Sequence, residues 1–423
     1  MKTLLSIFTI VGAVISATAI PRVDLTDVTL SQGAIVKVSY TLKNEPGIVT
    51  VDFQTNSTAG GWVSIGVENF TNVLGAVNRY VGTIDKTQTI LWRYSETWPG
   101  NLVTNGFRAV VTAWPTNNPP DYAALAIDGS KNHRFYTCAE ALPGGVSDIK
   151  YKRDVLLMRR VHADNKRFSM GAAYNERGFG SSNGAKRHWV SFTNDWYMGV
   201  YELTQSQAFT IFGNSTRWAL EAHRNHPDRD ILPASYIHYG HIKKETANAA
   251  TGYVASFSIP TEAQWEYTCR AGCPMALYNY RELGDNGYSA EPSVASTNLN
   301  EIAWYSENIS DNTTPKPVGL LKPNDWGFYD MLGNMPEYCR DYYVDDPSII
   351  FDWTKEQVDP QGPTAAQTTN NGKYRTKKGG GIRTTSTYNT CAARVEINGN
   401  YQNEYIGLRL QCNASFNFSA TAQ

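Results

Sequence analysis

The sequence has no long block of charge of one sign and, beyond its first nineteen residues, no apolar run long enough to cross a membrane. Its 38 lysines and arginines nearly balance its 39 aspartates and glutamates, so the formal net charge is -1. A balanced chain offers no basic surface to a polyanion. We therefore expect no nucleic acid partner, and no transmembrane segment in the mature protein.

Residues 1–19 predict a signal peptide. Lys2 supplies the positive charge, residues 4–17 are apolar, and residues 17–19 form the small-residue cleavage site Ala-Thr-Ala. The alternative, an amino-terminal membrane anchor, is disfavoured because the apolar stretch is short for a span. We expect a secreted or extracytoplasmic protein that begins near Ile20, where the six cysteines are able to form disulfides.

Residues 20–137 contain short runs rich in Val, Ile, Thr, Tyr and Trp, which Gly, Pro and Asn separate. Apolar and polar residues alternate within the runs, as is typical of strands with one buried face. No helical period lies between them, so we expect an antiparallel sandwich of the immunoglobulin or fibronectin kind, serving as a spacer or an adhesion unit. The predicted strands are Ala34 to Leu42, Ile48 to Gln54, Trp62 to Val67, Thr89 to Tyr94 and Phe107 to Trp114.

A second domain is expected after the turn-forming segment 142–146, Leu-Pro-Gly-Gly-Val, which predicts a linker. Two helix starts in this domain have the capping-box pattern, in which Thr204 and Thr261 each precede a glutamine by three residues. The second helix should end at Gly272 and Pro274. Short helices among strands and long loops place the domain in the α+β class.

Several short strings follow one another in this second domain. They are Phe168-Ser169-Met170-Gly171, Trp196 to Gln205, Ile259 to Tyr267, Pro317-Val318-Gly319, Pro323 to Asn334, Gly379-Gly380-Gly381, Ala393-Arg394 and Gly407-Leu408-Arg409. In this order they resemble the formylglycine-generating enzyme, or sulfatase-modifying factor, family. The resemblance covers about residues 150–412 and implies a C-type-lectin-like fold stabilised by calcium.

The resemblance also implies a structural calcium site at a glycine turn. Asp330 and Glu337 would supply side-chain oxygens, and Gly333 and Met335 would supply backbone carbonyls. Calcium takes six to eight hard oxygen ligands, which such a turn can offer. Pro336 stands where the family usually has tryptophan, and because proline fixes φ, the turn can differ in shape. The alternative interpretation is that the two acids are ordinary solvated residues.

The family's catalytic centre is not reproduced in this sequence. Family enzymes have two cysteines five residues apart, which bind copper and oxidise a substrate cysteine, because soft thiolates suit copper(I). These positions fall on Thr384 and Asn389, and the serine after the family's double glycine is Gly381. Copper is therefore not expected, no catalytic residue is assigned, and whether the chain is an enzyme stays open. Cys391 is expected to form a disulfide, such as one with Cys339.

The residues around the two replaced positions are rich in Thr, Ser, Tyr and Asn, which make adaptable binding surfaces. Their composition resembles the variable carboxy-terminal region of lectin-fold proteins that retroelements diversify. We therefore expect a surface that binds a protein or a glycan. The alternatives are a polar loop of a degenerate enzyme, a formylglycine-generating oxidase with altered residues, and a purely structural envelope or adhesion protein. The candidate ligand-binding residues are Thr384, Thr385, Thr387, Tyr388, Asn389, Asn398, Asn400, Tyr401, Asn403 and Tyr405.

Two other patterns are weak candidates for chemistry. His223 with His226, and His238 with His241, have metal-like spacing, but no acid or cysteine completes either pair. Residues 180–184, Gly-Ser-Ser-Asn-Gly, match a hydrolase elbow in their letters only, because no apolar strand precedes them. We expect surface histidines and a loop, respectively.

Overall fold

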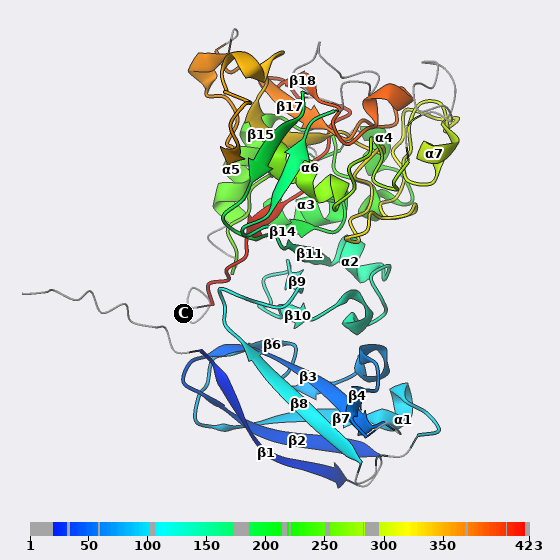
Figure 1. The fold of residues 1–423 in the computed structure, drawn as a ribbon. Coiled ribbons are helices and arrows are strands. Elements are labelled where there is room, and N and C mark those ends of the chain that lie inside the picture. Colours follow the sequence, from blue (N-terminus) through cyan, green and yellow to red (C-terminus); the bar gives the residue numbers. More distant parts are fainter. Residues whose placement is uncertain are drawn as a thin grey trace, which may run out of the picture.

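The computed structural model describes residues 20–418 except 32–33, 58–59, 102, 104–105, 173–185, 214–217, 220, 250–253, 282, 284–295, 369–370 and 403. The predicted signal peptide, the elbow-like segment 180–184 and Asn403 lie outside the described residues. A small β-sandwich occupies one end of the molecule and a larger mixed domain the other (Figure 1). Among the described helices, none is both long and apolar enough to span a bilayer.

Two antiparallel sheets form the sandwich. The first has the order β1 (Arg22–Ser31), β2 (Ile35–Lys43), β7 (Thr87–Arg93) and β5 (Leu74–Gly75). In the second, β3 (Gly47–Asn56) pairs with β4 (Trp62–Ser64), β6 (Arg79–Val81) and β8 (Phe107–Trp114). The five predicted strands are all present, although the third is shorter because a 3₁₀ turn, η1 (Val67–Phe70), begins at its predicted end.

Aromatic side chains fill the space between the two sheets. Phe53 of β3 stacks on Trp92 of β7, with ring centroids 4.6 Å apart, and Phe70 meets Phe53 edge-on. Alternation along each strand directs these rings inward, and aromatic pairs of this geometry add to the free energy gained by burial. The short helix α1 (Tyr94–Thr97) follows β7 at the edge of this core.

The boundary between the two parts lies earlier than the predicted residue 137. The strands β9 (Tyr122–Ala126) and β10 (Arg134–Tyr136) belong to a five-stranded sheet with the order β10-β9-β11-β14-β19, which is part of the mixed domain. The predicted linker at 142–146 also lies inside this domain, because Leu142 is buried in a cluster with Tyr122. Apolar strand patterns identify strands but do not say which sheet they join.

Three small sheets and several short helices make up the mixed domain. The five-stranded sheet is completed by β11 (Val155–Val161), β14 (Trp196–Gly199) and β19 (Gln411–Asn413). The other two sheets are β12 (Arg167–Met170), β13 (His188–Ser191) and β16 (Gln357–Val358), and β15 (Glu337–Tyr342), β17 (Tyr374–Lys378) and β18 (Val395–Asn398). The helices are α2 (Lys150–Arg153), α3 (Gln205–Phe212), α4 (Glu221–Arg224), α5 (Tyr239–Ala249), α6 (Glu262–Arg270) and α7 (Thr297–Asn300). The α+β prediction is confirmed.

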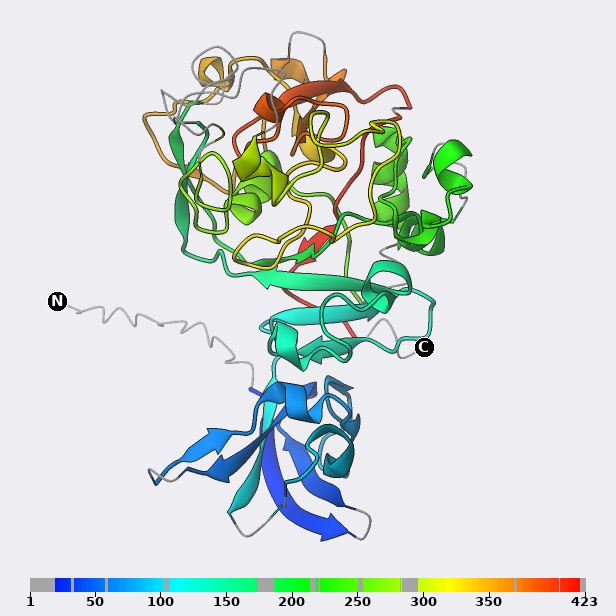
Figure 2. The same cartoon turned by 90° about the vertical axis from the view of Figure 1, so that its right-hand side faces the viewer.

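The carboxy-terminal segment after β19 ties the two parts together. In Figures 1 and 2 this red segment runs from the mixed domain down toward the sandwich. Phe418 stacks on Tyr80 of β6 with ring centroids 4.1 Å apart and planes within 2°, and Phe416 meets Phe135 of β10 edge-on. The sandwich is therefore packed against the mixed domain through aromatic rings.

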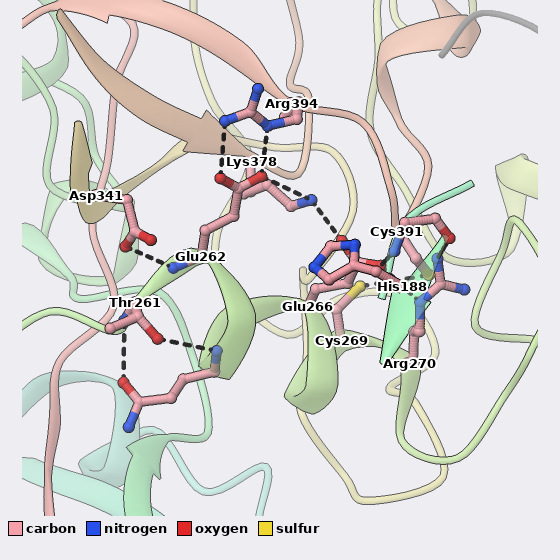
Figure 3. Close-up of polar contacts among 12 residues, drawn as sticks. His188, Thr261, Glu262, Glu266, Cys269, Arg270, Asp341, Lys378, Cys391 and Arg394 are labelled. Carbon is pink, nitrogen blue, oxygen red and sulfur yellow. Dashed lines mark hydrogen bonds and ion pairs between the residues drawn. The ribbon is translucent and has the colours of Figure 1, made fainter. Parts of the chain in front are cut away.

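Both predicted capping boxes are present. At the start of α6 the hydroxyl of Thr261 accepts the N–H of Gln264, and the side chain of Gln264 accepts the N–H of Thr261 (Figure 3); Thr204 does the same at α3. The cap of α6 is Ala271, with φ +48°, one residue before the predicted Gly272. All of α6 except Gln264 is buried, which an amphipathic pattern does not predict.

Candidate functional site

The two positions that would hold a cysteine pair lie against each other and carry a hydroxyl and an amide. Asn389 Nδ2 donates to Thr384 Oγ1 at 3.2 Å and to the carbonyl of Thr385 at 2.8 Å. Thr384 Oγ1 also accepts the N–H of Gly381 at 2.8 Å. The geometry of a paired site is therefore kept, but its donors are hard oxygen and nitrogen atoms, which suit copper(I) poorly.

The glycines at this site make room for its unusual side chains. Gly380 has φ +68°, and a Cβ there would lie 2.3 Å from Asn389 Oδ1. At Gly381 a Cβ would lie 2.6 Å from Cδ of Pro336. A side chain at 381 would therefore collide with the ring of Pro336 and, at 2.9 Å, with the backbone carbonyl of Asn334.

Cys391 lies outside this pair and next to another cysteine. Its Sγ is 3.6 Å from Sγ of Cys269 on α6, and both residues are fully buried (Figure 3). Burial raises the pKa of the Cys269 thiol well above its ordinary value, which disfavours the thiolate that binds metals. All six cysteines are free thiols in the structure, so the predicted disulfide between Cys391 and Cys339 is not formed; the sulfur in contact with Cys391 is that of Cys269, and Cys339 is buried in the same hydrophobic cluster.

Three buried acids, Glu202, Asp330 and Glu337, share the field of the buried Arg409. Arg409 donates to Glu337 Oε1 from Nη2 at 2.8 Å and from Nε at 3.0 Å, and Trp265 Nε1 donates to Glu337 Oε2 at 2.7 Å. Burial, followed by the charges of Asp330 and Glu337, raises the pKa of Glu202 well above its usual range. Burial also raises the pKa of Asp330 to about 6. The cluster is short of positive charge.

The predicted calcium ligands lie at this cluster. The carboxylate of Glu337 is already held by Arg409, so a calcium ion would share it with a guanidinium. No backbone N–H of the described residues donates to the carbonyl of Gly333 or of Met335. Within the described ranges, no group of three or more His, Cys, Asp or Glu is arranged to hold a metal.

A calcium ion would balance the excess negative charge of the three acids, so the residues fit the ion in part. The set Asp330, Gly333, Met335 and Glu337 stays a prediction. Asp330 has φ +53°, a conformation that aspartate and asparagine tolerate better than most residues. The shape of the turn is therefore set by its backbone and not only by the acids.

Most of the predicted ligand-binding residues that the structure describes lie in two loops that touch. The guanidinium of Arg383 lies over the ring of Tyr405, 4.3 Å from its centroid. Tyr388 and Tyr401 are exposed, with 41% and 65% of their surface accessible. We call residues 383–388 and 400–405 the recognition loops. Asn400 is also exposed, and the half-buried candidates are Thr384, Thr385, Thr387, Asn398 and Tyr405.

The prediction that Asn389 contacts a ligand is wrong, because this residue is fully buried and its Nδ2 donates inside the loop. Its Oδ1 is buried without a hydrogen-bond partner among the described residues. His223 also differs from the predicted surface histidine: it is buried, with Nδ1 3.2 Å from Ser235 Oγ and Nε2 2.8 Å from the carbonyl of Thr313. Burial lowers the pKa of His223, so the ring is neutral at pH 7.

A network of buried charges surrounds α6, and the sequence analysis missed it. Arg394 binds both carboxylate oxygens of Glu262, at 2.8 and 3.0 Å (Figure 3). Glu266 accepts from Lys378 Nζ and from Arg270 Nε, each at 2.9 Å. Burial alone would raise the pKa of Glu266, but the two cations outweigh it and lower the pKa to about 2. The only signal was two glutamates four residues apart on one helix.

A cavity opens beside this network. Its floor includes Glu262, Asp341 and Arg394, and its rim includes the rings of His188 and Trp353. Asp341 Oδ2 accepts the N–H of Glu262 at 2.8 Å (Figure 3). Burial, followed by the charge of Glu262, raises the pKa of Asp341 to about 7. The cavity therefore combines an apolar rim with a carboxylate that lacks a cation.

Residues 160–414 match the family described as the sulfatase-modifying factor enzyme 1-like domain. The formylglycine-generating enzyme of Mus musculus is 28% identical over 193 residues, 44% of this chain and 47% of that one. The enzyme of Bos taurus is 28% identical over 195 residues, 43% and 44% of the two chains. The chain thus spans about half the length of these relatives.

Among solved structures, Treponema denticola variable protein 1 aligns with a TM-score of 0.46 and 19% identity, over 61% of this chain and 95% of that one. The family match covers more than half of the sequence and takes in the strings, the acid cluster and the replaced cysteine positions. The chain is a member of the sulfatase-modifying factor enzyme 1-like domain family.

Proposed function

We propose that this family member is a secreted binding protein, which holds a protein or a glycan through its recognition loops, and not a copper-dependent oxidase. The observation that carries the proposal is the hydrogen bond between Asn389 and Thr384, which ties together the two side chains that would have to be thiolates. A threonine hydroxyl and an amide are not soft ligands, and neither is able to pass electrons to copper.

The nearest sulfurs do not substitute for the missing pair. Cys269 and Cys391 are close enough to share a soft metal, but they are fully buried among aromatic side chains. A substrate cysteine would have to reach them through the core. The raised pKa of Cys269 further disfavours a thiolate.

The recognition loops have the properties of a binding surface. Tyr388 and Tyr401 expose rigid rings at low entropic cost, and hydroxyl and amide groups surround them. The stacking of Arg383 on Tyr405 joins the two loops into one surface. Such a surface suits a partner that offers hydrogen-bonding groups together with an apolar face.

The enzymatic alternative is tested by oxygen uptake with copper(I) and a cysteine-containing sulfatase peptide. We expect no turnover, and turnover that disappears in Cys391→Ser would overturn the proposal. A variant with Thr384→Cys and Asn389→Cys is the matched test of whether thiols at these positions restore copper binding.

Binding is tested by glycan arrays and by pull-down from a range of extracellular proteins. The wild type is compared with Tyr388→Ala and Tyr401→Ala, with Phe209→Ala on α3 as the control, because Phe209 is equally exposed outside the loops. Binding of a ligand found in these screens should be lost in both tyrosine variants and kept in the Phe209→Ala control. Blank screens together with no turnover would favour a purely structural protein.

We further propose export and a stabilising calcium ion. Amino-terminal sequencing of the protein from culture medium should give a start near Ile20. Chelation of calcium should lower the melting temperature of the wild type but not of Asp330→Asn, which keeps the backbone conformation that asparagine tolerates. Equal melting temperatures with calcium and with chelator would contradict the calcium site.

A further inference from the structure

The cavity beside α6 belongs to neither the recognition loops nor the acid cluster at Arg409. Its volume is about 60 Å³, which is enough for water molecules or a small head group. The rim that continues outward is apolar, since Phe351, Pro347 and Pro360 join the aromatic residues there. The rings of His188 and Trp353 stack in parallel, with centroids 4.5 Å apart and planes within 5°.

The charges at the floor are paired with one exception. Arg394 neutralises Glu262 through two hydrogen bonds and also donates to the carbonyl of Val344, so three of its five N–H groups are used. Glu266, which also lines the cavity, is paired with Arg270 and Lys378. Asp341 is only 5% exposed, and the ion pairs found in the described part of the chain do not include it. Its one hydrogen bond in the described structure comes from a backbone N–H.

A buried carboxylate without a cation costs free energy unless it is protonated or binds a positive partner. An anionic ligand would face Asp341 together with Glu262. A purely apolar ligand would remove the carboxylate from solvent without offering it a hydrogen bond. An ammonium group offers both the charge and three N–H donors, and aromatic faces attract cations.

We infer that this cavity binds the ammonium head group of a small amine, with Asp341 as the acceptor and the ring of Trp353 against the apolar body. The same chemistry is offered by a free aromatic amine and by a lysine side chain. The test therefore has one probe for each source, namely benzylamine and N-acetyl-lysine methylamide.

Binding is measured by isothermal titration calorimetry on the full chain and followed by Trp353 fluorescence. Benzylamine, the lysine derivative or both should bind, and benzyl alcohol, which has the same ring but no charge, should bind at least tenfold more weakly than benzylamine. Asp341→Asn keeps the acceptor for the backbone N–H of Glu262 and should weaken amine binding at least tenfold. Asp352→Asn, an exposed acid next to Trp353, should leave it unchanged.

The pH dependence gives a second readout. The groups that face Asp341 are Glu262, Arg394, Arg340 and, at the rim, His188. As Asp341 ionises, the amine should bind about tenfold more tightly at pH 8 than at pH 6. The increase should be absent in Asp341→Asn.

The inference is overturned if neither amine binds at millimolar concentration, if benzyl alcohol binds as well as benzylamine, or if Asp341→Asn binds like the wild type. If Asp341→Asn does not fold, the inference is still tested in two ways. These are the comparison of benzylamine with benzyl alcohol on the wild type, and amine binding by the variant Trp353→Ala. Tighter binding of the lysine derivative would identify a peptide as the source, and tighter binding of benzylamine a free amine.

Discussion

Replacing Asp341 by asparagine should change how the stability of the mixed domain depends on pH. The pKa of Asp341 is raised from 3.8 to about 7 in the folded protein, because the side chain is buried and Glu262 lies beside it. Between these two values the folded state binds more protons than the unfolded state, so the free energy of unfolding falls as pH rises. The difference of about three pKa units corresponds to about 4 kcal/mol at most.

The asparagine variant carries no charge at this position but keeps an oxygen to accept the N–H of Glu262. It should therefore be more stable than the wild type at pH 8, and the difference should disappear toward pH 4. Urea unfolding at pH 5, 6, 7 and 8 measures the two slopes. Asp330, whose pKa is raised to about 6, contributes equally to the pH dependence of the free energy of unfolding in both proteins. Its contribution therefore cancels in the comparison.

Parallel stability profiles of Asp341→Asn and the wild type would refute the reasoning, since they would mean that Asp341 is solvated or paired in solution. The matched control is Asp352→Asn, an exposed acid eleven residues further along the chain. Its profile should follow that of the wild type.

Three further outcomes are expected. Glu266→Gln should lower the free energy of unfolding by about 3–5 kcal/mol in urea titrations, because two buried cations lose their common partner; a loss below about 1 kcal/mol would contradict the network. Mass spectrometry of non-reduced peptides should find Cys269 joined to Cys391, and free thiols at both positions would reject the pair. Gly381→Ser should destabilise the protein by about 1–3 kcal/mol, and a second change, Pro336→Ala, should recover only part of the loss, because the carbonyl of Asn334 still lies 2.9 Å from the added Cβ; equal losses with and without it would exclude the collision with the proline ring.

The parts of the fold that depend on local pattern could be predicted from the sequence. The strands of the sandwich follow from alternation, and α3 and α6 follow from Thr204 and Thr261, whose caps use residues three positions away. The assignment of β9 and β10 to the five-stranded sheet of the mixed domain could not be predicted, because it depends on the pairing of β9 with β11 and not on the composition of the strands.

The features of the candidate site likewise fall into those that the sequence shows and those that only the fold creates. The absence of thiols at Thr384 and Asn389 is visible in the sequence, but the burial of Asn389 is not, because a polar residue type says nothing about the hydrogen bonds that allow it to be buried. The network at α6 was also hidden. Glu262 and Arg394 are separated by 132 positions, and only the fold brings them together.

The departures from the family pattern at this site fit one another. Gly381 leaves room for Pro336, Gly380 leaves room for the side chain of Asn389, and Asn389 in turn bonds to Thr384. A cavity of about 240 Å³ remains beside these residues, lined by Pro336, Gly380, Thr384 and Tyr388. The Nδ2 of Asn389 donates to Thr384 Oγ1 and to the carbonyl of Thr385, so side-chain hydrogen bonds hold the loop that carries Tyr388. The same contacts that remove the thiolate chemistry therefore support a rigid surface for binding.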